Sequence, residues 1–390
     1  MLRLRERLAR VGRAARPVPL TRRELFALPP LGGYRLTRRR RLNYYLNRAE
    51  YERGRTRLWS FPTRLIVEPA SACNLRCPYC LTGAGEVGRP RALMTLDLYR
   101  RLLDELGDYL FEMELFHWGE PLLNPHVYDM LEMASARGIA TTVNTNLAVP
   151  FDRARAERLV ASGLSELTVS VDGATQETYE QYRVRGRLAR VVESCRLLVD
   201  ARRRLGRESM RLNLEFHVFA HNVDDVDGMR ELAATLGMPL RIFKGVVPGE
   251  DWDTAGRFDY CVAPVPLPCI WLWGTALVST DGGVLACRGG FQSADDMGRL
   301  AVRPAELGAA RFRDVWNGPR FRAARGFYRR RDGDPTHVCF DCPNTRMWER
   351  WKAHYVAGGT KETFDPGFTL NGIWNYFWDR GRRPDRASAT

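Results

Sequence analysis

Three closely spaced cysteines, Cys73, Cys77 and Cys80, are the residues of this 390-residue chain best suited to hold a metal centre. Their C-x3-C-x2-C spacing brings three thiolates into one short loop, and thiolates are the ligands that iron–sulfur clusters require. Three protein ligands for a four-iron cluster leave one iron open to a bidentate small molecule, which can receive an electron there. A zinc knuckle is the alternative, but it needs a fourth ligand from elsewhere in the chain.

Four later cysteines form a second candidate metal site: Cys269, Cys287, Cys339 and Cys342. Four thiolates saturate either a zinc ion or a second iron–sulfur cluster, and the spacing does not decide between the two. Of the two remaining cysteines, Cys195 lies in an amphipathic pattern that predicts a buried, inert side chain. Cys261 lies in a stretch rich in proline and glycine that reads as a linker.

From residue 64 onward, short β-branched runs alternate with longer amphipathic segments, which is the pattern of βα units wound into a parallel sheet or barrel. The predicted strands are Arg64–Glu68, Glu112–Phe116, Ala140–Asn144, Glu166–Val171, Arg211–Val218 and Leu240–Phe243. The predicted helices between them are Leu96–Leu110, Pro125–Arg137, Asp152–Ser162, Ala189–Leu205 and Val226–Leu236. Functional residues of such folds lie at the carboxyl ends of the strands, and the first cysteine loop follows the first strand.

Short polar motifs follow the next strands in the same way. They are Gly119, Glu120 and Pro121 after the second strand, Asn144 and Asn146 after the third, and Ser170 and Asp172 at the end of the fourth. Each motif alone is a weak signal, because Gly-Glu-Pro or Ser-x-Asp-Gly can form an ordinary turn. Their order along the chain, one after each strand, predicts that they line one small-molecule site.

The cysteine loop and these motifs closely resemble the radical S-adenosylmethionine (radical SAM) superfamily, over roughly residues 60–345. The resemblance implies a partial (β/α)6 TIM-like barrel, whose catalytic [4Fe–4S] cluster has three cysteine ligands and an open iron that binds S-adenosylmethionine. The Gly-Glu-Pro backbone is then expected to hold the methionine amino group, and the polar residues after the third and fourth strands to contact ribose and carboxylate. Arg183 matches a basic residue that pairs with the cofactor carboxylate, and Tyr79 is expected to shield the cluster or touch adenine.

The second cysteine set resembles the SPASM or twitch extension of such enzymes. A predicted hairpin, with strands Ala276–Ser279 and Val284–Cys287, is followed by Trp316-Asn317 and the closing C-x2-C pair. Full SPASM members carry more cysteines after that pair, whereas none follows Cys342 here, so the twitch pattern with one auxiliary [4Fe–4S] cluster is nearer. This small β-hairpin and helix domain is expected to transfer electrons or stabilise the fold, because a fully ligated cluster has no site for substrate.

These patterns divide the chain into four parts. Residues 1–58 form a basic, mostly helical extension, 59–245 the barrel, 246–345 the auxiliary-cluster domain, and 346–390 an aromatic-rich segment with a disordered end. The net charge of +14 comes mainly from the first part, which holds 17 Arg and 4 Glu. No nucleic-acid-binding module follows it, so we expect a solvated extension and no nucleic-acid partner.

No segment is apolar and long enough to span a bilayer, and no secretory signal is recognisable, which together predict a cytoplasmic protein without a membrane partner. The family chemistry further implies an external reductant such as a flavodoxin or ferredoxin. Cysteines in that compartment are more often metal ligands than disulfides.

The main functional hypothesis is hydrogen abstraction from a carbinol carbon of a sugar or aminocyclitol, giving dehydrogenation or epimerisation in antibiotic or other natural-product biosynthesis. It rests on the one-auxiliary-cluster layout, which looks like that of an aminocyclitol dehydrogenase. Cys261 is then a candidate hydrogen-atom donor for epimerisation, and Glu68 and His217, at the ends of the first and fifth strands, are candidate proton-transfer residues.

Two alternatives remain open at this stage. One is a radical SAM maturase that modifies a ribosomally made peptide, although residues 1–58 do not read as a leader-binding module. The other is a non-catalytic iron–sulfur or zinc protein, such as a redox sensor that binds nucleic acid through its basic arm. The ordered cofactor motifs argue against this second alternative.

Overall fold

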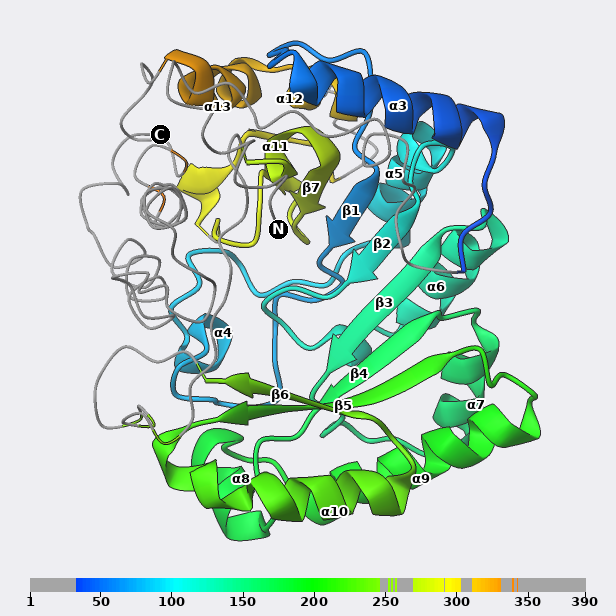
Figure 1. Ribbon diagram of the computed structural model, residues 1–390, viewed down its shortest axis with the longest axis vertical. Coiled ribbons are helices and arrows are strands. Elements are labelled where there is room, and N and C mark those ends of the chain that lie inside the picture. The colour runs from blue at the N-terminus through cyan, green and yellow to red at the C-terminus, as the bar shows by residue number, and fades with distance from the viewer. Residues whose placement is uncertain are drawn as a thin grey trace, which may run out of the picture.

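The protein is built on one nine-stranded sheet, in a computed structural model that describes residues 33–245, 252, 254, 257, 269–290, 292–302, 311–330, 339 and 342. The strand order is β6-β5-β4-β3-β2-β1-β7-β8-β9, and neighbouring strands from β6 through β1 to β7 are parallel. Figure 1 shows strands β1 to β6 curving into an open half barrel, with their carboxyl ends gathered on the side where α4 lies. The predicted partial barrel is confirmed.

Each predicted barrel strand is present, with bounds shifted by at most a few residues. The strands are β1 (Arg64–Val67), β2 (Glu112–Leu115), β3 (Ala140–Thr145), β4 (Glu166–Ser170), β5 (Arg211–Val218) and β6 (Leu240–Lys244). The helices after them are α4 (Leu81–Ala84), α5 (Leu96–Leu106), α6 (Val127–Ala136), α7 (Arg153–Ala161), α8 (Gln176–Tyr182), α9 (Leu188–Arg204) and α10 (Val226–Leu236). Short 3-10 turns, η1 (Pro121–Leu123) and η2 (Ala220–Asp225), add to these, and no helix of the described ranges is long and apolar enough to cross a membrane.

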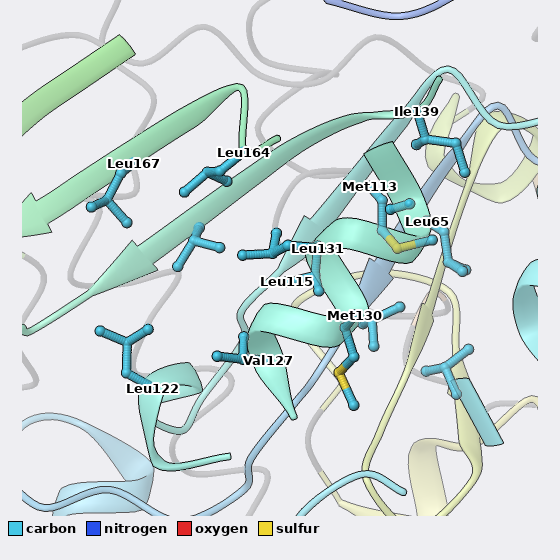
Figure 2. Packing of buried hydrophobic residues seen from close by; sticks show 14 of the residues in the cluster. Leu65, Met113, Leu115, Leu122, Val127, Met130, Leu131, Ile139, Leu164 and Leu167 are labelled. Carbon is cyan, nitrogen blue, oxygen red and sulfur yellow. The ribbon is translucent and has the colours of Figure 1, made fainter. Parts of the chain in front are cut away.

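The core lies between the outer face of the sheet and its helices. In α6, Val127, Met130 and Leu131 recur at the spacing of one helical face, and Figure 2 shows them packed against Met113 and Leu115 of β2. These side chains are fully buried, as is Cys195 on α9, whose predicted burial is confirmed. Burial raises the pKa of the Cys195 thiol to about 12, so it remains a protonated, unreactive thiol.

Helix α3 (Arg38–Glu52) shows that the basic N-terminal region is not simply a solvated arm. The Thr37 side chain caps its first turn, and Tyr44 and Tyr51 are buried against the barrel. Arg40 is 1% exposed and donates hydrogen bonds to the carbonyl oxygens of Gly138 (2.6 Å) and Arg137 (2.8 Å). A guanidinium is tolerated there because backbone carbonyls satisfy it.

The predicted hairpin is present as β7 (Thr275–Val278) and β8 (Gly283–Leu285), with Leu277 opposite Leu285. Gly282 supplies the positive φ of 80° that its tight turn requires. The sequence did not reveal that β7 also pairs in parallel with β1, so the hairpin extends the barrel sheet. The remaining elements are α11 (Trp271–Gly274), η3 (Ser293–Asp295), β9 (Gly298–Arg299), α12 (Phe312–Trp316) and α13 (Pro319–Arg330).

Candidate functional site

The first cysteine loop leaves β1 and ends at α4, which begins directly after Cys80. The backbone N–H of Cys80 bonds the carbonyl oxygen of Cys77 at 3.2 Å, which closes the loop into a turn. Gly83 packs so tightly on this turn that a Cβ atom would lie 2.5 Å from the Cys77 carbonyl oxygen. The turn hydrogen bond and the close approach of Gly83 thus define the shape of this loop.

The three thiols of this loop lie near one another. Burial raises the pKa of Cys73 to about 11 and that of Cys77 to about 12, and the electrostatic influence of Cys73, Cys77 and Cys80 on one another places the three thiols near each other. No three Cys, His, Asp or Glu side chains of the described residues stand close enough to hold a single metal ion. In a four-iron cluster each cysteine binds a different iron, so its ligands are spaced more widely than those of one ion. Because thiolate is the ligand, cluster binding must release these protons.

The Gly-Glu-Pro segment after β2 is locked to the cysteine loop. The backbone N–H of Glu120 bonds the carbonyl oxygen of Ala72 at 2.8 Å, and a Cβ atom on Gly119 would lie 2.0 Å from the carbonyl oxygen of Ala70. Only glycine fits this approach. The buried carboxylate of Glu120 accepts hydrogen bonds from the Thr145 hydroxyl (2.7 Å) and the Asn146 backbone (2.8 Å), which joins the ends of β2 and β3.

The polar residues at the ends of β3, β4 and β5 contact one another across the sheet. The hydroxyl of Ser170 donates to the side-chain oxygen of Asn144 at 2.8 Å, and the Asn144 amide donates to Glu215 at 3.1 Å. The Asn146 amide lies 3.5 Å from the Cys73 sulfur, which is the bond an amide donor makes to a thiolate or a cluster ligand. These side chains form a polar wall that leads to the cysteine loop.

Asp172 holds Arg183 and His217 in place from outside the cavity lining. Its buried carboxylate accepts from Arg183 Nε at 2.6 Å and from the His217 backbone at 2.8 Å. Although burial disfavours its charged form, Arg183 and His217 lower the pKa of Asp172 to about 2. The His217 ring lies between Asp172 (3.2 Å) and Glu215 (3.6 Å), and these carboxylates raise its pKa against the opposing effect of burial.

A cavity of about 360 Å³ joins these parts into one site. The predicted residues that line it are Cys73, Cys77, Tyr79, Cys80, Gly119, Glu120, Asn144, Asn146, Ser170, Arg183 and His217. Aromatic rings form another part of the wall: Tyr79 lies 5.1 Å from Trp252, and Tyr182 lies 4.3 Å from Phe219 between ring centroids. Such a cavity combines an apolar wall, an organised cation and neutral hydrogen-bonding groups, as a charged nucleoside requires.

Four residues predicted as catalytic or cofactor-binding are not among those that line this cavity. Asp172 lies behind Arg183, and Pro121 begins the buried turn η1. Glu68 was predicted to face the cleft, but its 2% exposed carboxylate instead accepts from the Trp118 backbone at 3.3 Å, under the β7–β8 hairpin. Cys261 lies outside the described residues.

Several residues that line the cavity are not among the predicted site residues: Phe116, His117, Trp118, Thr145, Tyr182, Glu215 and Phe219. Only Glu215 left a usable signal. It lies opposite Ser170 in the register and shares the two-residue alternation of β5 with His217, so both side chains belong to the same face.

The second cysteine set is assembled from distant segments. Cys269 precedes α11 and Cys287 follows β8, and their thiols and that of Cys342 influence one another electrostatically. Burial is the main reason that the pKa of Cys269 is raised, and Cys339 is also buried. The backbone N–H of Gly289 donates to the Cys287 sulfur at 3.4 Å, a contact that a bound thiolate would strengthen.

Two ion-pair groups connect the second set to the first. Arg288, next to Cys287, pairs with Glu114 on β2 and lies 4.4 Å above the Phe116 ring. Arg89, from the segment after the cysteine loop, is buried between Asp281 (3.0 Å) and Asp296. Since the buried charge of Arg89 has partners in the hairpin and in the segment after it, and Arg288 pairs with β2, these groups fix the hairpin against the barrel.

Comparison with known proteins matches both halves. A family model described as the radical SAM superfamily matches residues 67–210, and one described as an iron–sulfur cluster-binding domain, SPASM, matches residues 269–343. Matches to these two domains imply a catalytic [4Fe–4S] cluster with S-adenosylmethionine and auxiliary iron–sulfur ligation.

Individual relatives are more distant. The AdoMet-dependent heme synthase of Methanosarcina barkeri is 27% identical over 51% of this chain and 56% of its own length. The mycofactocin maturase of Mycobacterium ulcerans is 31% identical over 46% of this chain and 47% of its own. The chain thus spans about half the length of the curated relatives it matches. Among solved structures, Streptococcus suis SuiB bound to S-adenosylmethionine has a TM-score of 0.52 at 13% identity, covering 74% of this chain and 72% of SuiB, which supports the fold.

Proposed function

Because this chain belongs to the radical SAM superfamily and carries a SPASM-type cluster-binding domain, we propose that it is an enzyme that modifies a peptide by radical chemistry. The single observation that carries the catalytic part is the shared cavity, in which the cysteine loop meets the polar ends of three strands. Once bound, the cluster and S-adenosylmethionine would supply an electron and a 5′-deoxyadenosyl radical for hydrogen abstraction from the substrate. An external reductant such as a flavodoxin or ferredoxin is part of this proposal.

In this proposal the residues of the chain bind, orient and shield. Cys73, Cys77 and Cys80 hold the catalytic cluster, and Cys269, Cys287, Cys339 and Cys342 hold the auxiliary one. Arg183, aligned by Asp172, pairs with the cofactor carboxylate, because a guanidinium held at a fixed angle binds a carboxylate with two parallel hydrogen bonds.

The other residues of the cavity wall have different proposed roles. The backbone around Gly119 and Glu120 receives the methionine amino group, and Asn144 and Ser170 contact the ribose hydroxyls. Tyr79 and its aromatic neighbours exclude water, which a carbon radical in the cavity requires. The His217 ring and the Glu215 carboxylate lie 3.6 Å apart, and this pair is a candidate to take up a proton from the substrate.

The peptide as substrate is supported by the relatives. The mycofactocin maturase matches at 31% identity and is named as a maturase, and the PqqA peptide cyclase of Bradyrhizobium diazoefficiens matches at 28% identity and is named for action on a peptide. The predicted carbohydrate-like substrate has no comparable support among these relatives. The peptide hypothesis therefore replaces it as the leading proposal.

Oxidation of a carbinol carbon is kept as a second candidate for one reason. The His217–Glu215 pair lies in the cavity, 3.6 Å apart, and could accept the hydroxyl proton that such an oxidation releases. Epimerisation would need Cys261 as a hydrogen donor, and that residue lies outside the described ones.

The test uses anaerobically reconstituted protein with dithionite and S-adenosylmethionine. Synthetic peptides encoded by the genes next to this one, and in parallel a panel of aminocyclitols, are followed by mass spectrometry together with 5′-deoxyadenosine. A peptide mass change that requires S-adenosylmethionine supports the proposal. Turnover of an aminocyclitol with unchanged peptides would establish the second candidate instead.

A further inference from the structure

The segment between α3 and β1 presents a row of cations on the surface. Arg53, Arg55, Arg57 and Trp59 are exposed, Trp59 to 80%, whereas Leu58 between the last two is buried. Neither Arg55 nor Arg57 forms an ion pair with a described residue, and residues 53–59 contain no Asp or Glu. We call the four exposed side chains the basic face. Exposed tryptophan beside several arginines is a composition typical of protein interfaces.

The auxiliary-cluster domain holds the backbone that displays the basic face. The carbonyl oxygen of Arg55 accepts a hydrogen bond from the indole nitrogen of Trp273 on α11, at 2.9 Å. Asn317, directly after α12, bonds both the N–H and the carbonyl oxygen of Leu58, at 2.7 and 2.9 Å. Because this backbone is already fixed, a partner that binds the basic face does not have to order it first.

A short path leads from the basic face to Cys269, a ligand of the second site. The Cys269 carbonyl oxygen accepts from the Leu272 backbone at 3.1 Å, and the next residue, Trp273, donates to the Arg55 carbonyl oxygen. The buried ring of Tyr51 lies 5.4 Å from that of Trp273. Electrons tunnel through proteins most readily over short runs of bonded and closely packed atoms. The basic face is therefore placed where an outside electron donor comes close to the second site.

We propose that the basic face binds an acidic electron-carrier protein, which reduces the auxiliary cluster. The inference rests on the proposed function, because radical chemistry of this kind consumes electrons from outside the chain. In the step itself, the redox centre of the carrier loses one electron and the cluster held by Cys269 gains it, and no covalent bond forms or breaks. The arginines attract and orient the acidic partner, while Trp59 provides a large apolar contact.

Charge alone would also suit a nucleic acid or an anionic membrane, so the position of the basic face decides between these partners. It lies on the auxiliary-cluster domain and next to the Cys269 path, which favours a partner that delivers electrons. The chain itself supplies no charge complement nearby in sequence. Residues 1–32 and 346–390 each contain more Arg and Lys than Asp and Glu.

Binding is tested with a reduced flavodoxin of low isoelectric point and the anaerobic holoenzyme at low ionic strength. Arg55→Glu combined with Arg57→Glu should weaken binding by roughly tenfold or more, because two attractive contacts become repulsive. The control, Arg190→Glu with Arg203→Glu, makes the same charge change at exposed positions of α9, at the other end of the molecule in Figure 1. It should keep the affinity within about twofold. An equal loss in both variants would indicate attraction without a defined site and overturn the proposal.

Electron delivery is followed by stopped-flow measurement of flavin oxidation. The variant of Arg55 and Arg57 should slow this oxidation by roughly tenfold, by the same loss of affinity, yet release 5′-deoxyadenosine normally with dithionite, a small reductant that needs no docking. Unchanged flavin oxidation, or an equal loss with dithionite, would overturn the proposal. Cys287→Ala should bind flavodoxin but lose the fast phase of flavin oxidation. A fast phase that persists in this variant would overturn the auxiliary cluster as the acceptor.

Two further binding measurements test the other partners. Transfer RNA and vesicles of phosphatidylcholine with phosphatidylserine are offered to the wild type and to the variant of Arg55 and Arg57. Loss of binding to either, with unchanged affinity for flavodoxin, would overturn the proposal in favour of that partner. If no peptide is turned over, the proposed function fails, whereas flavodoxin binding and flavin oxidation still decide what the basic face binds.

Discussion

The two cysteine sites differ in where their ligands come from. Cys73, Cys77 and Cys80 share one loop that its own backbone closes and that Glu120 ties to the next strand. Cys269 and Cys287 lie on either side of the hairpin strands, and Cys339 and Cys342 come from much later in the chain. The first site is thus defined by local structure, whereas the second exists only once the hairpin has paired with the barrel.

This difference predicts that assembly of the second site depends on the barrel, whereas assembly of the first site does not depend on the hairpin. Loading the second site should depend on the docked hairpin, while the first loop needs only its neighbouring strands. The contacts of Arg288 and Arg89 link the two, because they join residues next to one ligand set to residues next to the other.

The largest effect is expected at the first site. Changing Cys73, Cys77 and Cys80 together to Ala should reduce 5′-deoxyadenosine release to background and remove about four irons per chain, since the catalytic cluster is lost. Iron analysis and chromatography of the reaction measure both. Cys195→Ala is the matched control, and equal loss in that variant would contradict the assignment.

The second site should respond differently. Cys287→Ala is expected to remove about four irons as well and to abolish substrate modification, while release of 5′-deoxyadenosine continues at a reduced rate. The same assays apply, with spectra of the reduced protein to identify the remaining cluster. Complete loss of cleavage would show that the two sites are not assembled independently.

Asp172 tests how far the barrel site is organised in advance. Asp172→Asn leaves the Arg183 guanidinium without its buried counterion, which should cost about 3 kcal/mol of stability and weaken S-adenosylmethionine binding. In the wild type the pKa of Asp172 is about 2 against an ordinary 3.8, so its carboxylate stabilises the fold above pH 4. That contribution is lost as the pH falls from about 4 to about 2. Chemical denaturation and calorimetric titration measure these effects, and full-strength cofactor binding would argue against the role of Arg183.

Glu68 tests the junction between the two sites. Its pKa is raised, whereas that of Asp172 is lowered, so its effect on stability changes with pH in the opposite direction. Burial raises its pKa to about 7 from an ordinary 4.5, so the folded state prefers the protonated acid and loses stability as the pH rises between these values. Glu68→Gln should abolish that slope and make the protein more stable than the wild type at pH 8 by about 3 kcal/mol. Denaturation of holoprotein at pH 5 and pH 8 measures the difference. A variant less stable than the wild type at pH 8 would assign Glu68 an ionised role.

The sequence predicted the barrel well because its strands and helices carry strong local patterns. Leu65 and Val67 alternate with Ile66 on β1, and α6 repeats apolar residues on one helical face. Cavity residues such as Asn144 and Ser170 could be predicted because they lie at the carboxyl ends of strands. Glu68 also ends a strand, but the side chain is covered by the Trp118 backbone and the hairpin, and no local pattern reports such a tertiary cover.

The same reason explains the other misses. Cavity residues such as Tyr182 and Phe219 look like ordinary core aromatics in the sequence, and their place follows from α8 and the end of β5 meeting at the cysteine loop. Parallel pairing of β7 with β1 joins segments far apart in the chain, which short-range spacing does not encode.

That pairing has a consequence for how the protein can be divided. Without β7, the backbone donors and acceptors of Arg64–Val67 would form a bare sheet edge beside the cysteine loop, and such edges recruit strands from other molecules. By pairing with β1, the hairpin is therefore expected to protect the barrel from edge-to-edge aggregation, in addition to positioning Cys287. A fragment that ends at residue 245 would leave β1 as an unpaired, aggregation-prone edge strand, and β1 is the strand that leads into the first cysteine loop.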